Sequence, residues 1–205
     1  MAASEAGVKR VVFASSSSVY GDSKTLPKVE DMPINPKSPY AISKAAAELY
    51  CRNFYTIYGL ETVALRYFNV IGPRQDPNSQ YSGVVPLFMK MMQEGKTPTV
   101  HGDGEQSRDF TYVGNVVSAN LKSCTAPDAA GEVFNIGCGE KYTILTLIEY
   151  LNEINGLNLE PEFVEERKGD VKHSLADISK ARHVLNYEPE IGFKEGLRRY
   201  CESFS

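Results

Sequence analysis

Short runs of apolar residues alternate along the chain with longer segments in which apolar residues recur every three or four positions. The apolar runs are typical of strands buried on both faces of a parallel sheet. Such strands are expected at 10–14, 62–68 and 132–136. The periodic segments predict helices, which are expected at 40–58, 84–94, 113–123, 144–154, 179–185 and 193–204. Strands alternating with helices indicate an α/β fold with a parallel sheet.

Polar and conformationally special residues mark where several of these elements begin and end. Ser38 can cap a helix, Pro39 suits the first helical position, and Gly59 suits its end. Residues 21–37 and 72–82 contain prolines and polar side chains and are expected to be loops.

Composition narrows the class of protein. The 205 residues are 42% hydrophobic and 23% charged, as in an ordinary globular protein. A net charge of -4 without a long basic run argues against a nucleic-acid partner. No run approaches the ~18 apolar residues that span a bilayer. The first ten residues contain no hydrophobic signal core, so a cytoplasmic protein without membrane association is expected.

The cysteines and histidines are scattered rather than clustered. The four cysteines form no CxxC pair, and the three histidines show no metal-ligand spacing. We therefore expect free thiols in a reducing compartment and no metal site.

A serine run and a Tyr/Lys pair are the main candidates for chemistry. Residues Ser15 to Ser18 follow the first expected strand, and Tyr40 and Lys44 lie four apart on one helix face. A nearby ammonium favours the phenolate form of tyrosine, which makes it usable as a general acid/base. Serines at a strand's carboxyl end lie where open α/β sheets bind ligands. A YxxxK spacing alone is also common in exposed helical pairs; the serine run favours the functional interpretation.

Five blocks along the chain resemble an extended short-chain dehydrogenase/reductase of the NAD-dependent epimerase/dehydratase family, and within it most closely the UDP-N-acetylglucosamine 4-epimerases. The blocks occur in order at 12–21 (VFASSSSVYG), 38–44 (SPYAISK), 65–75 (LRYFNVIGPRQ), 102–110 (GDGEQSRDF) and 167–174 (RKGDVKHS). The resemblance implies a partial Rossmann-like parallel sheet with a small α/β substrate-binding domain, and NAD as cofactor.

The resemblance implies roles for individual residues. It makes Ser16, Tyr40 and Lys44 catalytic, and Tyr40 and Lys44 also contacts of the cofactor. Further cofactor contacts are implied for Ser15, Tyr67 and Phe68. The residues implied to bind the UDP-sugar are Ser17, Ser18, Asn69, Val84, Phe88, Thr99, His101, Arg108, Arg167, Asp170 and Ser174, with Arg108 and Arg167 clamping the diphosphate. For Phe88 and His101, ordinary packing is an equal alternative.

Two positions choose among the reactions of this family. The family's dehydratases and decarboxylases carry an acidic residue where this chain has Ser16 to Ser18, so 4-epimerisation through a 4-keto sugar is favoured. Ser174 replaces a bulky tyrosine of epimerases restricted to non-acetylated sugars, which leaves room for a 2-acetamido group. A UDP-uronate epimerase or decarboxylase, and a non-catalytic UDP-sugar-binding module, remain alternatives.

The resemblance also implies that the first strands of the family's sheet, with the glycine-rich cradle for the NAD pyrophosphate, are absent from this sequence. A truncated chain that is inactive alone is expected. The Gly137-Cys138-Gly139 turn lacks a third glycine, because Tyr142 stands at that position, and is expected to be structural.

Domain boundaries and assembly follow from the same resemblance. It implies that residues 1–73 and 111–150 belong to the NAD-binding domain, and that 74–110 and 151–205 belong to the nucleotide-sugar-binding domain. A homodimer through the 40–58 helix is implied as well.

Overall fold

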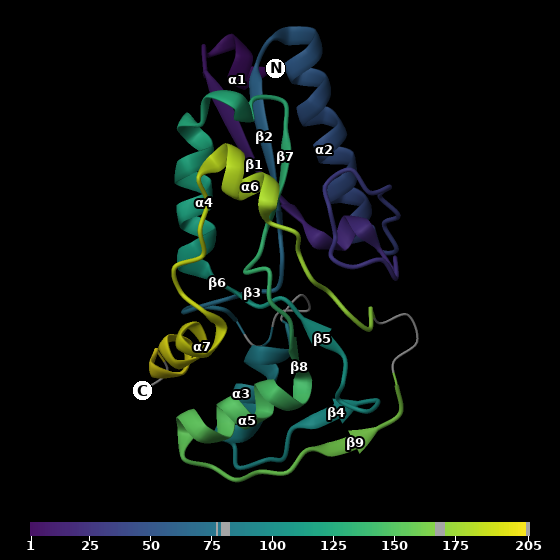
Figure 1. Cartoon of the computed structure of the whole chain (residues 1–205), viewed down its shortest axis with the longest axis vertical. Helices are drawn as coiled ribbons and strands as arrows, with labels where there is room; N and C mark the ends of the chain where they lie inside the picture. The colour runs from purple at the N-terminus through teal and green to yellow at the C-terminus, as the bar shows by residue number, and fades with distance from the viewer. Residues whose placement is uncertain (77, 79–82, 167–170, 204–205) are drawn as a thin grey trace.

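The computed structural model describes residues 1–76, 78, 83–166 and 171–203. Figure 1 shows two packed regions, one above the other along the long axis. The upper region holds a three-stranded sheet, and the lower region holds helices packed beside short strand pairs.

The upper sheet is parallel and has the order β1-β2-β7. Its strands are β1 (Arg10–Ser16), β2 (Glu61–Tyr67) and β7 (Val133–Ile136). Ser16 pairs in register with Tyr67, and Tyr67 with Ile136. The carboxyl ends of all three strands therefore meet at one edge, and the expected α/β fold with a parallel sheet is confirmed.

Helices α2 (Pro39–Tyr58) and α4 (Val113–Thr125) lie on opposite faces of this sheet (Figure 1). Alternate residues of β2 contact them. The Thr62 hydroxyl donates to the Cys51 carbonyl of α2 at 2.8 Å, whereas the Tyr67 hydroxyl donates to the side-chain oxygen of Asn120 in α4 at 3.0 Å. Side chains alternate across a strand, so each helix contacts its own face.

The ends of α2 follow the expected signals. The Ser38 hydroxyl accepts a hydrogen bond from the Ala41 amide at 3.1 Å, and Pro39 is the first helical residue. Gly59 ends the helix in the left-handed region, with φ of +68°. The remaining short helices of the upper region are α1 (Ala2–Glu5), η1 (Ser17–Tyr20), η2 (Pro127–Ala129) and α6 (Ser179–Leu185).

The lower region contains three helices and strand pairs of two or three residues. The helices are α3 (Val84–Gln93), α5 (Ile144–Asn155) and α7 (Phe193–Glu202). Parallel pairs join β3 (Val70–Ile71) to β6 (Thr111–Tyr112) and β4 (Thr99–His101) to β9 (Glu162–Val164), and an antiparallel pair joins β5 (Ser107–Arg108) to β8 (Tyr142–Thr143). Most of these strands are too short to give a two-residue period, so the sequence did not reveal them.

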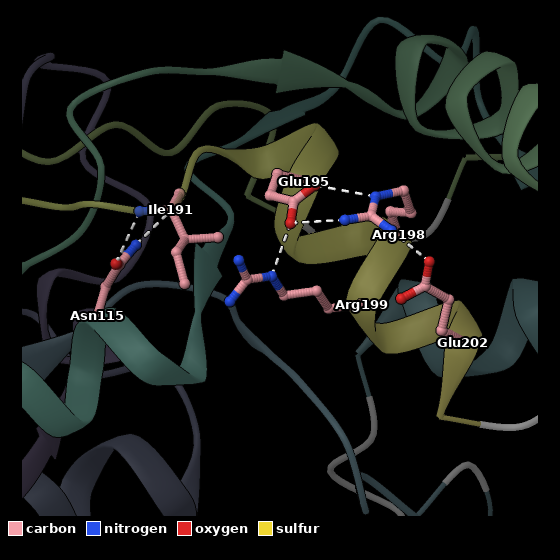
Figure 2. Close-up of polar contacts among 6 residues, drawn as sticks. All are labelled: Asn115, Ile191, Glu195, Arg198, Arg199 and Glu202. Atoms are coloured by element: carbon pink, nitrogen blue, oxygen red, sulfur yellow. Dashed lines mark hydrogen bonds and ion pairs between the residues drawn. The ribbon is translucent and has the colours of Figure 1, made fainter.

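Helix α7 is strongly amphipathic. Its exposed face carries ion pairs between Glu195 and both Arg198 and Arg199, and between Arg198 and Glu202 (Figure 2). The segment just before α7 is hydrogen-bonded to α4 (Figure 2). The Asn115 side chain of α4 accepts from the Ile191 amide at 3.1 Å and donates to the Ile191 carbonyl at 2.8 Å.

Two clusters of buried apolar side chains correspond to the two regions. The first lies around the upper sheet and includes α6, and the second lies among α3, α5 and α7. The division into 1–73 with 111–150 and 74–110 with 151–205 stays a prediction. Most of α5 falls in the predicted NAD-binding domain but packs in the second, lower cluster, and α6 falls in the predicted nucleotide-sugar-binding domain but packs in the first, upper cluster. Among the described residues, no helix is long and apolar enough to cross a membrane.

Candidate functional site

A cavity of about 1240 Å³ is lined by residues at the carboxyl ends of the upper strands and by residues of the lower region. Its wall includes Ser15, Ser16, Ser17 and Ser18 after β1, and Tyr40 from α2. Residues from the lower region close the other side. Open α/β sheets bind ligands at this edge, so the cavity is the candidate site.

The serine run turns from strand into helix inside the cavity wall. Ser16 caps η1, and its hydroxyl oxygen accepts from the Ser18 amide at 3.2 Å. The proton of the Ser16 hydroxyl therefore remains available for a ligand oxygen. Ser15 is buried and its hydroxyl donates to the Glu48 carboxylate of α2. The buried Ser18 hydroxyl has no hydrogen-bond partner among the described residues.

Tyr40 and Lys44 lie on one face of α2, as their spacing predicted. Tyr40 is exposed at the cavity wall. The Lys44 ammonium donates to the Ala14 carbonyl of β1 at 2.9 Å and lies 5.6 Å from the centre of the Tyr40 ring. The lysine thus holds the start of α2 against the end of β1.

The end of β2 supplies three neighbouring candidates with different surroundings. Tyr67 lines the cavity and bonds to Asn120, and burial raises the pKa of its phenol. Phe68 is fully buried in the first apolar cluster, and its side chain does not line the cavity. Asn69 lines the cavity with a positive φ of 25°, and its amide donates to the Asp109 carbonyl at 3.2 Å.

The candidates of the lower region line the same cavity. They are Val84, Phe88, Thr99, His101, Arg108 and Ser174. Arg108 donates to the carbonyls of Ser107 and Lys172 at 3.0 and 3.2 Å, which anchors its guanidinium at the cavity wall. A ring nitrogen of His101 lies 3.1 Å from the Glu165 carbonyl oxygen. Arg167 and Asp170 lie outside the described residues.

Asp109 explains why the Gly137-Cys138-Gly139 turn is structural. Its fully buried carboxylate accepts from the amides of Cys138, Gly139 and Ala176 at 2.8 to 3.1 Å. A Cβ atom at Gly137 would lie 2.8 Å from that carboxylate. Desolvation raises the pKa of Asp109 to about 6, against the effect of the three donors. The amides that could bind a phosphate are therefore used internally.

The sequence analysis did not assign several polar residues of the cavity wall to the site, among them Gln75 and Gln106. Gln75 has a buried side-chain oxygen without a hydrogen-bond partner among the described residues, and Gln106 donates to the His101 carbonyl at 2.9 Å. Both lie inside blocks that carried the family resemblance, at 65–75 and 102–110, and that was the available signal.

The chain matches a model of the NAD dependent epimerase/dehydratase family over residues 1–137. It is 39% identical over 204 residues to a UDP-glucose 4-epimerase of Mycolicibacterium smegmatis, an alignment that covers 99% of this chain and 64% of that protein. It is 38% identical over 195 residues to a UDP-glucuronate 4-epimerase of Thermodesulfobacterium geofontis, covering 94% and 58%.

Solved structures of similar proteins share the fold. The UDP-N-acetylglucosamine 4-epimerase of Methanobrevibacter ruminantium M1, in complex with UDP-N-acetylmuramic acid, superimposes with a TM-score of 0.94 at 43% identity, covering 99% of this chain and 65% of that one. The UDP-glucuronic acid 4-epimerase of Bacillus cereus, with UDP-glucuronic acid and NAD, gives 0.86 at 35% identity, covering 95% and 60%. The chain thus spans less than two thirds of the length of these relatives.

Proposed function

The chain belongs to the NAD-dependent epimerase/dehydratase family, and from this premise we propose that it carries the acid/base and sugar-nucleotide-binding residues of a UDP-sugar 4-epimerase. One observation carries the proposal. Ser16 and Tyr40 line the same cavity as Asn69 and Arg108, so groups for proton transfer lie in one space with groups for binding a diphosphate.

The residues at the strand ends fit a nicotinamide cofactor. Tyr40, Lys44 and Tyr67 would hold its nicotinamide side, and the orphaned Ser18 hydroxyl offers a further donor to a ligand. Contacts from Ser15 and Phe68 would involve their backbone, because the Ser15 hydroxyl bonds to Glu48 and the Phe68 ring is buried. When bound, NAD supplies the acceptor and donor of the hydride at C4 of the sugar.

The side chains of this chain handle the proton and the position of the sugar. Tyr40 takes the proton of the C4 hydroxyl, and Ser16 donates a hydrogen bond to the same oxygen as it becomes a carbonyl. Arg108 holds the diphosphate while the sugar turns within the cavity, so that the opposite face of C4 is presented. Tyr40 then returns the proton to the new hydroxyl.

The acetamido sugar is the substrate that we favour. Ser174 is a small residue of the cavity wall, and its amide donates to the Ser107 carbonyl at 2.9 Å, which places it beside Arg108. A 2-acetamido group needs this space. UDP-glucuronate is the second candidate, because a UDP-glucuronate 4-epimerase is among the similar proteins.

Tyr40→Phe tests the reaction. We expect the chain alone to be inactive, so the substitution is made in the chain completed by the family's NAD-binding strands. With NAD and UDP-N-acetylglucosamine, we expect turnover to fall by about 100-fold or more while the affinity for UDP is retained, because only the proton-transferring oxygen is lost. Tyr58→Phe is the matched control, since Tyr58 lies exposed at the far end of the same helix. Equal and measurable turnover by Tyr40→Phe and by the unsubstituted completed chain would contradict the proposal.

Ser174→Tyr tests the substrate. The larger side chain should abolish turnover of UDP-N-acetylglucosamine and spare UDP-glucose, because it fills the space of the acetamido group. Turnover of both sugars measured side by side decides the matter. Undiminished turnover of the acetamido sugar would leave UDP-glucose or UDP-glucuronate as the better assignment.

A homodimer through α2 is part of the proposal. Ile42, Leu49, Tyr50 and Ile57 are 55–69% exposed. Leu49 and Tyr50 follow Ile42 by seven and eight residues, and Ile57 follows them by eight and seven, so all four lie on one side of the helix. In α2 as described, Arg52 is the only exposed charged residue. A nearly uncharged apolar stripe can pair with its own copy across a twofold axis. Leu49→Glu should shift sedimentation to the monomer, whereas Leu121→Glu on α4 should not.

The cytoplasm is the compartment that we propose. All four cysteines are free thiols, and one of them, Cys124, is exposed. Exposed free thiols persist in a reducing environment.

A further inference from the structure

A buried ion pair joins α2 to the sheet next to the strand ends that line the cavity. It links Glu48 of α2 to Arg66 of β2, and each side chain is 6% exposed. The Arg66 guanidinium donates through Nε to Glu48 Oε1 at 3.0 Å and through Nη2 to Oε2 at 2.8 Å. Two parallel hydrogen bonds fix orientation as well as distance. The helix therefore cannot slide or rotate on the sheet without breaking at least one.

The ion pair is hydrogen-bonded to residues on both sides of Ser16. Ser15, which pairs with Arg66 in the strand register, donates its hydroxyl proton to Glu48. On the other side of the run, Arg66 Nη1 donates to the Tyr20 hydroxyl at 2.9 Å. Ser16 lies between these two attachment points, and its position depends on both.

The same ion pair also fixes the position of Tyr40 relative to the end of β1. Glu48 follows Lys44 by one helical turn and Tyr40 by about two, so the three residues lie along one side of α2. When Arg66 fixes Glu48, it also fixes how far Tyr40 reaches beyond the end of β1. Glu48 and Arg66 line no part of the cavity themselves.

Stability alone does not account for these charges. Replacing a buried ion pair by apolar side chains of similar volume is often neutral or stabilising. What the ion pair adds is a fixed geometry. We propose that Glu48 and Arg66 are positioning residues, which hold α2 against the strand ends so that Tyr40 and Ser16 reach the same substrate oxygen. This inference rests on the proposed function.

Glu48→Asp is the primary test, because it keeps the charge and shortens the side chain by one methylene. We expect the amides of Ala41 to Ala45 in α2, and of Gly21 after η1, to exchange hydrogen about tenfold faster. Amides of Leu147 to Leu151 in α5 should be unaffected. Equal acceleration of both sets would show a merely global loss of stability and overturn the proposal.

Glu61→Asp is the matched control. Glu61 pairs with Arg10 at 2.7 Å at the opposite end of the same two strands. The same shortening there should leave the exchange of residues 41–45 unchanged. If Glu61→Asp accelerates it as much as Glu48→Asp, the effect is not specific to the strand ends, and the proposal fails.

Turnover supplies a second readout. In the chain completed by the family's NAD-binding strands, a displacement of about 1 Å should lower kcat by about 100-fold and leave KM within about threefold, because Arg108 and the rest of the binding wall are untouched. The double variant Glu48→Met with Arg66→Met leaves no unpaired charge and should melt near the unchanged chain. If it keeps both full turnover and slow exchange, the pair is only structural.

Failure of the proposed function looks different. If the chain completed by the family's NAD-binding strands shows no turnover of any UDP-sugar, the proposed function is refuted. The exchange of residues 41–45 in Glu48→Asp and Glu61→Asp still decides whether the pair positions α2.

Discussion

The two regions that enclose the cavity are held together by different kinds of contact. In the upper region, Ser15, Tyr20, Glu48, Arg66 and Asn135 form a hydrogen-bonded network at the strand ends, next to the residues proposed to transfer the proton. In the lower region, an aromatic cluster consists of Phe110, Tyr142, Tyr150 and Phe193, and Phe110 is part of the cavity wall proposed to bind the sugar nucleotide. Hydrogen bonds are directional, whereas apolar packing is not.

The difference fits what the proposed function would require of each wall. A proton is transferred only between groups held within hydrogen-bond reach, so the upper wall needs fixed orientations. The lower wall encloses a ligand and needs mainly the right volume. The predictions below separate the two modes of support, and begin with the largest expected change.

Phe193→Ala should give the largest loss of stability. Phe193 is 1% exposed and stacks on Phe110 with ring centres 4.5 Å apart. Removing the ring should lower the free energy of unfolding by about 3–5 kcal/mol, measured by urea titration. Phe163→Ala, at a site 55% exposed, is the control. A loss below about 1 kcal/mol at Phe193 would mean that the lower region does not depend on aromatic packing.

Asp109 should make stability fall as pH rises from about 4 to 6. Its pKa is raised to about 6 in the folded chain by desolvation, whereas in the unfolded chain it is ordinary. Between those values the folded chain keeps a proton that the unfolded chain has lost, so unfolding releases a proton and the free energy of unfolding falls with pH. The expected fall is on the order of 2–3 kcal/mol.

Asp109→Asn is the control for this pH dependence. In this variant the fall in the free energy of unfolding between pH 4 and 6 that is due to Asp109 should be absent, even if the variant is less stable at every pH. Urea titrations at several pH values between 4 and 7 provide the measurement. An identical slope in both proteins would assign the pH dependence to other carboxyl groups.

Tyr20→Phe should have an intermediate effect. The phenol accepts from Arg66 at 2.9 Å and donates to Asn135 at 2.7 Å, and burial raises its pKa. The substitution removes both bonds and keeps the ring, so a loss of about 1–3 kcal/mol in the free energy of unfolding is expected. Tyr58→Phe, at an exposed position of α2, should leave the free energy of unfolding unchanged. If Tyr20→Phe is equally silent, the directional bonds of the upper region contribute little stability.

Arg198→Ala should have the smallest effect. Arg198 pairs with Glu195 and Glu202 on the exposed face of α7 (Figure 2). Exposed pairs are weakened by solvent, and we expect the thermal midpoint to move by about 1 °C or less. If Arg198→Ala lowers the thermal midpoint as much as Tyr20→Phe does in the same measurement, buried and exposed polar contacts contribute equally to stability.

Local signals allowed much of the fold to be predicted. The bounds of α2 were predictable because Ser38, Pro39 and Gly59 act on their immediate neighbours. The interleaved strands β3, β5, β6 and β8 were not, because two residues carry no period and their pairing depends on distant partners.

The candidate site was predictable to the extent that its residues form recognisable blocks. Ser16, Tyr40 and Asn69 line one cavity, in agreement with the resemblance, although their roles stay predictions. The ion pair between Glu48 and Arg66 could not be predicted, because the two residues are 18 positions apart and no local sequence pattern indicates that α2 packs Glu48 beside Arg66. The partners of Asp109 were equally hidden, since they come from two other segments.

The carboxylate of Asp109 has a consequence for motif scanning. A strand followed by Gly-x-Gly and a helix scores as a dinucleotide fingerprint, yet here the backbone nest is already filled by an anion from the same chain. Such a false positive can be recognised only in three dimensions, by asking whether an internal carboxylate already occupies the donors. Redesigning this turn to take up a phosphate would have to begin by removing Asp109.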